Sequence, residues 1–400
     1  MKEQQVVIIT YYHFPCDHAV LEYLFAKELG NYQNIKFLFT TPENIKNKWE
    51  KWHNSDVRLF RKKAGRSISS KLYSLTAYME MITWLIENLI QKKIKVILIR
   101  DMPIFLFFVL PLKLLFKVKV FFQLSAPHDD FYYERYKKTN NLKKYIFLLT
   151  AKGYKLLFRY LFQFVDMLFP ITSFYESTLK KVYKIKNSYP LTMGVDLAWV
   201  GHKTLPIKEI ESIKRNNFIV TYFGSLDSYR NTDFLIDIFM ELRNEVKNVK
   251  LILMGKCWDI QEERALIEKL GSLNIKDEVI YTGYLSRDNL KNYLQYCDLS
   301  FSPIPPDDHY VISSPTKLYE SLGNGVPVIA NREILEQKKV VEESKAGILV
   351  SYNKNDFAKA AVSLLLNDEQ RLIMKKRGKQ YILDQYSYKR IAQNISTFFN

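Results

Sequence analysis

Short runs of β-branched and aromatic residues alternate with helical segments along this 400-residue chain, and this alternation limits what it can fold into more than any other feature. In the first half the pattern predicts strands at 6–10, 35–39, 95–100, 119–125 and 166–172, and helices around 19–29, after Met102 and over 142–164. Strands that alternate with helices in this way form a parallel sheet with helices on both faces.

The alternation restarts after a polar connection at 203–217. The second set of runs predicts strands at 218–224, 249–255, 278–283, 299–303, 326–330 and 347–351, with helices at 233–243, 261–271, 287–296 and in the segment from Pro315. A chain of this length is too long for one ordinary core. The sequence therefore predicts an α/β protein with two Rossmann-like domains, residues 1–198 and 199–384.

The charge balance narrows the class of partner. Lys and Arg outnumber Asp and Glu by 59 to 42, a net charge of +17. Such an excess favours nucleic acid, a phospholipid surface or phosphorylated small molecules, although a single lysine is more often only solvated. No RNA-recognition, KH or zinc-finger pattern is present, so we expect no nucleic acid partner.

Cysteine spacing and hydropathy favour a cytoplasmic protein. Cys16, Cys257 and Cys297 lie far apart without a C-x-x-C pair, which argues against a zinc site or a disulfide framework and suits a reducing compartment. The N-terminus leads directly into a strand and lacks the apolar run of a signal peptide. The most apolar run, Pro103–Phe122, is interrupted by proline and lysine, so we expect no membrane-spanning helix.

Polar residues follow two predicted strands of the second half, at the sheet edge where parallel sheets bind ligands. Gly224 and Ser225 end the first of these strands, and Arg230 lies at the start of the next helix. Gly255 ends the following strand. Glycine permits close approach of the backbone, and arginine neutralises a phosphate, although an arginine in a loop is more often only solvated.

The segment SSPTKLYESLGNGVPVIAN carries more polar residues than a helix and a strand require. Ser314 suits the N-cap of its helix and Pro315 the first turn. The amides of Thr316 and Lys317, the Lys317 ammonium and the helix dipole would then bind a diphosphate. Glu320, about one turn later, would accept hydrogen bonds from the two hydroxyls of a ribose. The alternative is a surface ion pair between Lys317 and Glu320.

Together these segments resemble the retaining, nucleotide-sugar-dependent glycosyltransferases of family four (glycosyl transferases group 1). SSPTKLYESLGNGVPVIAN is similar to the family's nucleotide-binding segment, and YFGSLDSYRNTDFLIDIF to its glycine turn and following helix, with Arg230 where a lysine is common. FPITSFYESTLKKVY and YPLTMGVDLAWV resemble the end of the family's first domain. YSYKRIAQNISTFF resembles the closing helix that crosses back onto that domain.

The resemblance implies the GT-B fold, in which two Rossmann-like domains face each other across a cleft and residues 385–400 pack back on the first domain. It implies a nucleotide-diphosphate-sugar donor bound by the second domain, at Gly224, Ser225, Arg230, Gly255, Ser314, Pro315, Thr316, Lys317 and Glu320. Arg230 and Lys317 would stabilise the departing diphosphate, so we expect no cofactor and no metal. The chain has no D-x-D at a strand end, and Asp307–Asp308 lies in a proline-rich loop.

The resemblance also assigns His128 of the first domain to catalysis, together with Arg230 and Lys317. Similar enzymes hold a histidine near the transferred sugar, and FFQLSAPHDD puts His128 just after a strand. The alternative is a structural hydrogen-bonded pair of this histidine with a carboxylate.

Three departures from the family pattern keep other functions open. Ile312 stands where many relatives have the first of two glutamates, Ser225 stands where many have a basic residue, and TYYHFPCDH replaces an N-terminal Gly-Gly loop. A GT-B sugar-nucleotide 2-epimerase is one alternative. A degenerate glycosyltransferase that serves as a non-catalytic binding subunit is another.

The expected reaction is transfer of a hexose-type sugar to a hydroxyl acceptor, a glycan or lipid-linked acceptor, in bacterial surface polysaccharide or glycolipid biosynthesis. Because such acceptors are often lipid-linked, two basic clusters predict attachment to the anionic inner face of the cytoplasmic membrane. The first cluster is Arg61, Lys62, Lys63, Arg66 and Lys71; the second is Lys143, Lys144, Lys152, Lys155 and Arg159, interleaved with Tyr145, Phe147, Leu148, Leu156, Leu157 and Phe158. The alternative for the second cluster is an amphipathic helix whose apolar face packs on the sheet.

Overall fold

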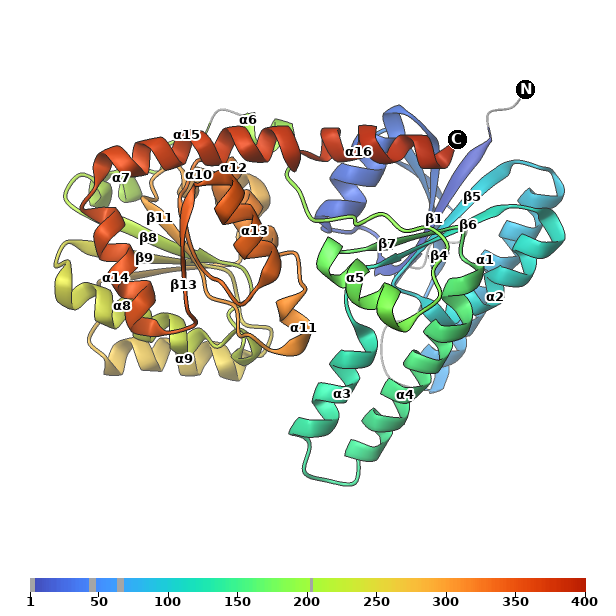
Figure 1. Cartoon of the computed structure of the whole chain (residues 1–400), viewed down its shortest axis with the longest axis horizontal. Helices are drawn as coiled ribbons and strands as arrows, with labels where there is room; N and C mark the ends of the chain where they lie inside the picture. Colours follow the sequence, from blue (N-terminus) through green and yellow to red (C-terminus); the bar gives the residue numbers. More distant parts are fainter. Residues whose placement is uncertain (1–3, 43–47, 63–67, 202–203) are drawn as a thin grey trace. The chain divides into compact units, whose positions relative to one another are not determined.

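The computed structural model describes residues 4–42, 48–62, 68–201 and 204–400, and the chain divides into two compact units. Unit 1 comprises Met1–Thr192 and Tyr388–Asn400, and unit 2 comprises Met193–Ser387. The division falls before residue 198 because Val195 and Trp199 are buried in a core of unit 2. Figure 1 shows a sheet with helices on both of its sides in each unit.

Unit 1 contains a seven-stranded sheet in the order β3-β4-β2-β1-β5-β6-β7. Its strands are β1 (Gln5–His13), β2 (Asn34–Thr41), β3 (Trp49–Trp52), β4 (Ser55–Arg61), β5 (Ile94–Arg100), β6 (Lys119–Leu124) and β7 (Met167–Pro170). The predicted runs became β1, β2, β5, β6 and β7. The sequence did not predict β3 and β4, which pair antiparallel at one edge, so the expectation of an entirely parallel sheet is wrong for this hairpin.

The helices of unit 1 follow the predicted alternation, with several additions. They are η1 (Val20–Glu28, a π-helix), η2 (Leu29–Asn31), α1 (Ile68–Ile90), α2 (Pro103–Phe116), α3 (His128–Lys138), α4 (Lys144–Leu161), η3 (Phe162–Phe164), α5 (Ser173–Val182), α16 (Tyr388–Ser396) and η5 (Thr397–Phe399). Among the described residues, no helix combines the length and the apolar character that crossing a bilayer requires.

The last helix of the chain, α16, packs on unit 1, as the resemblance to the GT-B fold implied. Tyr388 is buried and its ring stacks on Tyr23 of η1, with 6.4 Å between the ring centroids. Phe399 is also buried and lies edge-on to Phe121 of β6 at 5.1 Å. Residues that lie far apart in the sequence therefore share one apolar core in this unit.

Unit 2 contains a six-stranded parallel sheet in the order β10-β9-β8-β11-β12-β13. Its strands are β8 (Phe218–Phe223), β9 (Val249–Met254), β10 (Val279–Gly283), β11 (Leu299–Ser302), β12 (Val328–Asn331) and β13 (Gly347–Val350). Its helices are α6 (Leu197–Gly201), α7 (Lys208–Lys214), η4 (Ser228–Arg230), α8 (Thr232–Glu245), α9 (Ile260–Ser272), α10 (Arg287–Leu294), α11 (Asp308–Val311), α12 (Thr316–Gly323), α13 (Leu335–Ser344), α14 (Lys354–Leu365) and α15 (Asp368–Gln385).

Both faces of this second sheet are covered, which explains why its strands are mainly apolar. Val220 and Tyr222 of β8 join the core with α8, α9 and α14. Ile219 and Phe223, on either side of them along the strand, join the opposite core with α10, α12, α13 and α15. Successive strand residues point to opposite faces, so two cores need a continuous apolar run. The polar Thr221, within β8, is buried and its hydroxyl donates a 2.9 Å hydrogen bond to the Ile252 carbonyl.

Candidate active site

Two glycine turns meet at the carboxyl ends of β8 and β9. Gly224 has a φ of +123° and Gly255 a φ of +151°, values that L-residues with side chains rarely adopt. A Cβ atom at Gly255 would lie 1.8 Å from the Gly224 carbonyl oxygen, so only glycine fits there. A Cβ at Gly224 would lie 3.5 Å from Lys317 Nζ. The structure thus brings together three residues that the sequence assigned to the donor site.

Lys317, in the first turn of α12, rests on an aromatic ring. Its Nζ lies 3.7 Å from the ring centroid of Tyr222, a buried residue of β8. Burial lowers the pKa of the Lys317 ammonium well below its usual value, the charge of Arg230 lowers it further, and Glu320 opposes both effects. A cation in this environment gains most from an added negative charge.

Arg230 is the second cation at this sheet edge. It ends η4, and the left-handed Asn231 (φ 52°) then starts α8 by accepting a hydrogen bond from Phe234 N at its side chain. The Arg230 guanidinium stacks on Tyr310 of α11, 4.7 Å from the ring centroid. Tyr222 and Tyr310 hold the two cations, and the sequence analysis named neither ring.

The loop after β8 is held by Asp227, a second residue that the sequence analysis missed. Asp227 is buried, and its Oδ1 accepts a hydrogen bond of 2.7 Å from Trp258 N, in the loop after β9. Its Oδ2 accepts a hydrogen bond from the Ser225 hydroxyl. The Ser225 side chain is therefore bound within the loop, and only the backbone of Ser225 is available to contact a ligand.

The start of α12 differs from the prediction that Ser314 caps it. The N-cap residue is Pro315, without a side-chain cap, and the helix begins at Thr316. Ser314 Oγ instead accepts a hydrogen bond from Met193 N (3.0 Å) and lies 3.0 Å from Tyr319 Oη. The predicted cap is wrong because tertiary partners compete for that hydroxyl. The amides of Thr316 and Lys317 still open this helix.

A buried carboxyl group supports α12 from behind. Glu336 of α13 accepts a 2.8 Å hydrogen bond from Tyr319 Oη and a 3.4 Å bond from Tyr386 Oη. Burial raises the pKa of Glu336, although hydrogen bonding from Tyr319 opposes the shift. With Ser314, these side chains tie α12 to α13 and to the end of α15, which fixes the position of the helix start.

Glu320 lies on the side of α12 that faces α10. It is buried, and its Oε1 lies 2.9 Å from Arg287 Nη1, at the start of α10. Glu320 is therefore not part of a solvated surface pair, although its charge still acts on Lys317. Arg287 was not singled out in the sequence, because 33 residues separate it from its partner and nothing local marks it.

Unit 1 has a polar cluster of its own at the carboxyl ends of β5 and β6. The Asp101 carboxylate accepts hydrogen bonds from Ser125 N (2.7 Å) and from the Ser125 hydroxyl, and it lies 3.5 Å from Arg100 Nε and 3.6 Å from His128 Nε2. Burial would raise the pKa of Asp101, but the contact with His128 and the charge of Arg100 outweigh it and lower the pKa. The His128 ring stacks on Tyr154, 5.8 Å away.

The cluster of unit 1 thus contains the pair of histidine and carboxylate that the sequence offered as the structural alternative for His128. Arg100 is only 2% exposed, and its Nη2 lies 3.2 Å from His18 Nε2. Across the residues that the structure describes, no three His, Cys, Asp or Glu side chains gather as metal ligands.

Comparison with known proteins shows what unit 2 is similar to. The family model described as "Glycosyl transferases group 1" matches residues 205–381, which lie within unit 2. N-acetyl-alpha-D-glucosaminyl L-malate synthase of Bacillus anthracis is 22% identical over 194 residues. That alignment spans 48% of this chain and 48% of the relative, about half the length of each.

Solved structures with the same fold cover nearly the whole chain. Sucrose-phosphate synthase from Thermosynechococcus elongatus superposes with a TM-score of 0.73 at 15% identity, over 99% of this chain and 98% of that one. The Anabaena protein HepE, in complex with UDP-glucose, gives 0.68 at 14% identity over 98% of both chains. The structure of trehalose-6-phosphate from E. coli bound with UDP-2-fluoro glucose gives a TM-score of 0.72 at 12% identity over 99% of both chains.

Fold and sequence therefore agree on the class: two Rossmann-like units in the arrangement of elements of the GT-B glycosyltransferases. Over residues 205–381, which lie in unit 2, the chain is similar to the glycosyl transferases group 1.

Proposed function

We propose that the protein transfers a sugar from a nucleotide-diphosphate-sugar to a hydroxyl acceptor, with retention at the anomeric carbon. The observation that carries this proposal is the pair of cations at the end of β8. Lys317 and Arg230 rest on the rings of Tyr222 and Tyr310 rather than on carboxylates, beside a turn that only glycine permits. Such a place suits the diphosphate of a nucleotide sugar.

In the proposed reaction, the bond from the anomeric carbon to the diphosphate oxygen breaks as the acceptor oxygen bonds to the same face of that carbon. The acceptor proton passes to the departing diphosphate. Lys317, Arg230 and the first amides of α12 stabilise the charge that develops on the leaving group. Glu320, held by Arg287, accepts hydrogen bonds from the ribose hydroxyls, and His128 contacts the transferred sugar.

The relatives suggest which donor to test first. HepE binds UDP-glucose, and the E. coli structure holds a fluorinated UDP-glucose. We therefore propose a UDP-hexose as the first candidate. We also propose that transfer needs no divalent metal, because the two cations and the helix amides fill that role. Activity should survive EDTA, and loss with EDTA reversed by manganese would show that a metal is required.

For the acceptor we propose a growing bacterial surface glycan or glycolipid, reached from the cytoplasmic side of the membrane. The basic residues of α4 support this, because apart from Ala151, Phe158 and Leu161 its side chains are not buried. The buried Ala151, Phe158 and Leu161 belong to its packed side, so the alternative of an amphipathic helix whose apolar face packs on the sheet is decided by membrane-binding measurements. In the first cluster, Lys63 and Arg66 fall outside the described residues, as does the side chain of Lys71.

The test is a donor screen with the purified protein. Thermal shift with nucleoside diphosphates and their sugars identifies the donor, and release of the nucleoside diphosphate then reports turnover. Arg230→Ala should reduce the shift strongly at the same ligand concentration. Binding without turnover for every acceptor tried would favour the binding subunit, for which Ile312 is the specific reason. Conversion of the donor into its 2-epimer would favour the epimerase.

A further inference from the structure

Helix α2 exposes an apolar stripe. Leu114 is 78% exposed and Leu115 74%, and three more residues of the same helix, Ile104, Phe107 and Phe108, are exposed as well. Their spacing of three, four and seven places them on one side of the helix, while Leu106, Val109 and Leu110 face the core of unit 1. Exposed leucines and phenylalanines that form a contiguous stripe mark an interaction surface.

Helix α4 exposes a second stripe. Its α3-facing side is covered, because Tyr154 stacks on Tyr132 and Phe147 lies beneath Arg135. Another side exposes apolar residues at helical spacing from the loop before α4 to η3: Leu142, Ile146, Leu149, Leu156, Tyr160 and Phe164. Figure 1 shows α3 and α4 as an antiparallel pair that extends away from the sheet of unit 1.

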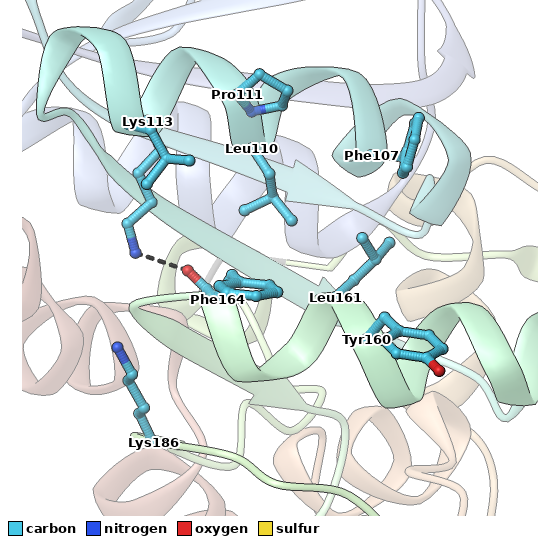
Figure 2. Close-up of a pocket in the computed structure, with 9 residues that line it drawn as sticks. Phe107, Leu110, Pro111, Lys113, Tyr160, Leu161, Phe164 and Lys186 are labelled. Carbon is cyan, nitrogen blue, oxygen red and sulfur yellow. Dashed lines mark hydrogen bonds between the residues drawn. The ribbon is translucent and has the colours of Figure 1, made fainter.

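The two stripes meet at a groove of about 460 Å³ between α2 and the end of α4 (Figure 2). This volume lies within the roughly 300–1,000 Å³ range of small-molecule sites. The groove is lined by Phe107, Leu110, Pro111, Lys113, Leu114, Tyr160, Leu161, Phe164 and Lys186. The lining of the groove is almost entirely apolar, so a polar ligand would find few hydrogen-bond partners there.

One lysine of the groove holds its two walls together. Lys113 Nζ donates hydrogen bonds to the Phe164 carbonyl (2.6 Å) and to Asp166 Oδ1 (2.7 Å), as Figure 2 shows for the first of these. Asp166 Oδ2 in turn accepts a hydrogen bond from Val120 N. The groove is therefore a built feature of the fold, anchored to β6, rather than a gap between loosely packed helices.

Positive charge surrounds this apolar surface. Lys186 is exposed at the groove, and Lys117 follows α2 directly. Lys152 and Lys155 of α4 lie beside the exposed stripe of that helix. An apolar groove with lysines at its edge is complementary to a molecule that joins a hydrocarbon chain to an anionic head.

We propose that this groove binds one acyl chain of an anionic phospholipid, with the phosphate of the headgroup at Lys186. The stripes of α2 and α4 then lie in the interfacial layer of the leaflet, and the chain fills the space between Leu110 and Leu161. This site extends the proposed electrostatic contact with the membrane. It is independent of the donor site, which is in unit 2 and is measured separately.

The first test uses vesicle sedimentation with phosphatidylcholine alone and with added phosphatidylglycerol, at low salt and at 1 M NaCl. The screening length falls to about 3 Å at 1 M, which removes most of the surface attraction. The wild type should retain measurable binding to the anionic vesicles at high salt. Leu114→Glu should reduce that residual binding at least tenfold, because it places a carboxylate in the groove.

Two matched variants separate the groove from other causes. Leu372→Glu makes the same change at an exposed leucine of α15 in unit 2 and should bind vesicles like the wild type. Leu115→Glu changes an equally exposed residue of α2 that does not line the groove, and its loss should be clearly smaller than that of Leu114→Glu. Equal losses at Leu114 and Leu115 would show that the stripe binds membranes without a lipid in the groove.

The second test locates the chain directly. Phosphatidylglycerol with a diazirine in its acyl chain, photolysed in vesicles with the wild-type protein, should label Leu110, Leu161 and Phe164. Label confined to other segments would overturn the proposal. So would dimerisation of the wild type in the absence of lipid that Leu114→Glu abolishes, because the surface would then be covered by a second copy. Thermal shift with the nucleoside diphosphate confirms that each variant is folded.

Discussion

Charged residues lie near the carboxyl ends of strands in both units, but their partners differ. In unit 1, Arg100 lies against Asp101 and His18, and Asp101 is further bound by Ser125. In unit 2, Arg230 and Lys317 rest on tyrosine rings, and each experiences the other's charge. The charges of the cluster in unit 1 compensate one another, whereas the two cations in unit 2 would be stabilised by a bound anion. Arg100, at the end of β5, is therefore structural, whereas Arg230, in the connection after β8, is a candidate ligand-binding residue.

The largest effect should come from breaking the compensated pair. Arg100→Ala leaves the buried Asp101 carboxylate without its cation, a change that typically costs about 3–5 kcal/mol of unfolding free energy. We expect a lowered melting temperature in calorimetry, together with unchanged nucleotide affinity in whatever fraction stays folded. A protein as stable as the wild type would mean that Arg100 is not the partner of Asp101.

The corresponding substitution in unit 2, Arg230→Ala, should leave stability unchanged and weaken nucleotide binding instead. Arg230→Ala deletes a charged hydrogen-bond donor, which is worth about 1.5–3 kcal/mol, roughly 10- to 150-fold in dissociation constant. Isothermal titration with the nucleoside diphosphate found in the screen measures the change. Arg264→Ala, on α9, is the matched control and should bind like the wild type. Unchanged affinity in Arg230→Ala would remove this residue from the site.

A smaller effect separates the ribose contact from the diphosphate contact. Glu320→Ala should weaken nucleotide binding about tenfold, since it removes an acceptor for the ribose hydroxyls. The 2′-deoxynucleotide should bind the wild type more weakly than the ribonucleotide, and Glu320→Ala should bind both equally. If Glu320→Ala still preferred the ribonucleotide as strongly as the wild type does, the ribose would have to bind elsewhere.

The smallest expected effect is a pH dependence of nucleotide binding, which comes from Lys317 of unit 2 and from no residue of unit 1. The pKa of Lys317 is lowered by burial and by Arg230. A bound diphosphate favours the charged amine and raises this pKa toward its usual value. Between the two pKa values the protein takes up a proton on binding, so affinity falls as pH rises. Titrations in buffers of different ionisation enthalpy measure the uptake, which Lys317→Met should abolish.

Local patterns were enough to predict most strands and part of the candidate site. Apolar runs marked the strands of both sheets, and Gly224, Arg230 and Lys317 stood out because they follow a strand or open a helix. The β3–β4 hairpin was missed because its residues alternate with charged ones and make no apolar run. Alternation of apolar and polar residues also indicates a strand, but the prediction relied on continuous apolar runs.

The parts that depend on distant neighbours could not be predicted. Ser314 has the residue type of a cap, yet its hydroxyl binds Met193 N, 121 positions away. Glu320 pairs with Arg287, and Lys317 rests on Tyr222, and in each case the partner lies on another element. Propensity describes a residue and its close neighbours, whereas these contacts follow from how the helices pack on the sheet.

The return of α16 to unit 1 has a consequence for how the protein is made. Unit 2 is one continuous stretch, Met193–Ser387, whereas unit 1 needs Tyr388–Asn400 to finish its core. Those residues are translated after all of unit 2, so on the ribosome the second unit is complete before the first. Until Phe399 reaches Phe121 and Phe169, the aromatic side chains of β6 and β7 lack their last partner. During synthesis, unit 1 therefore exposes an unfinished apolar surface for as long as it takes to translate the whole of unit 2.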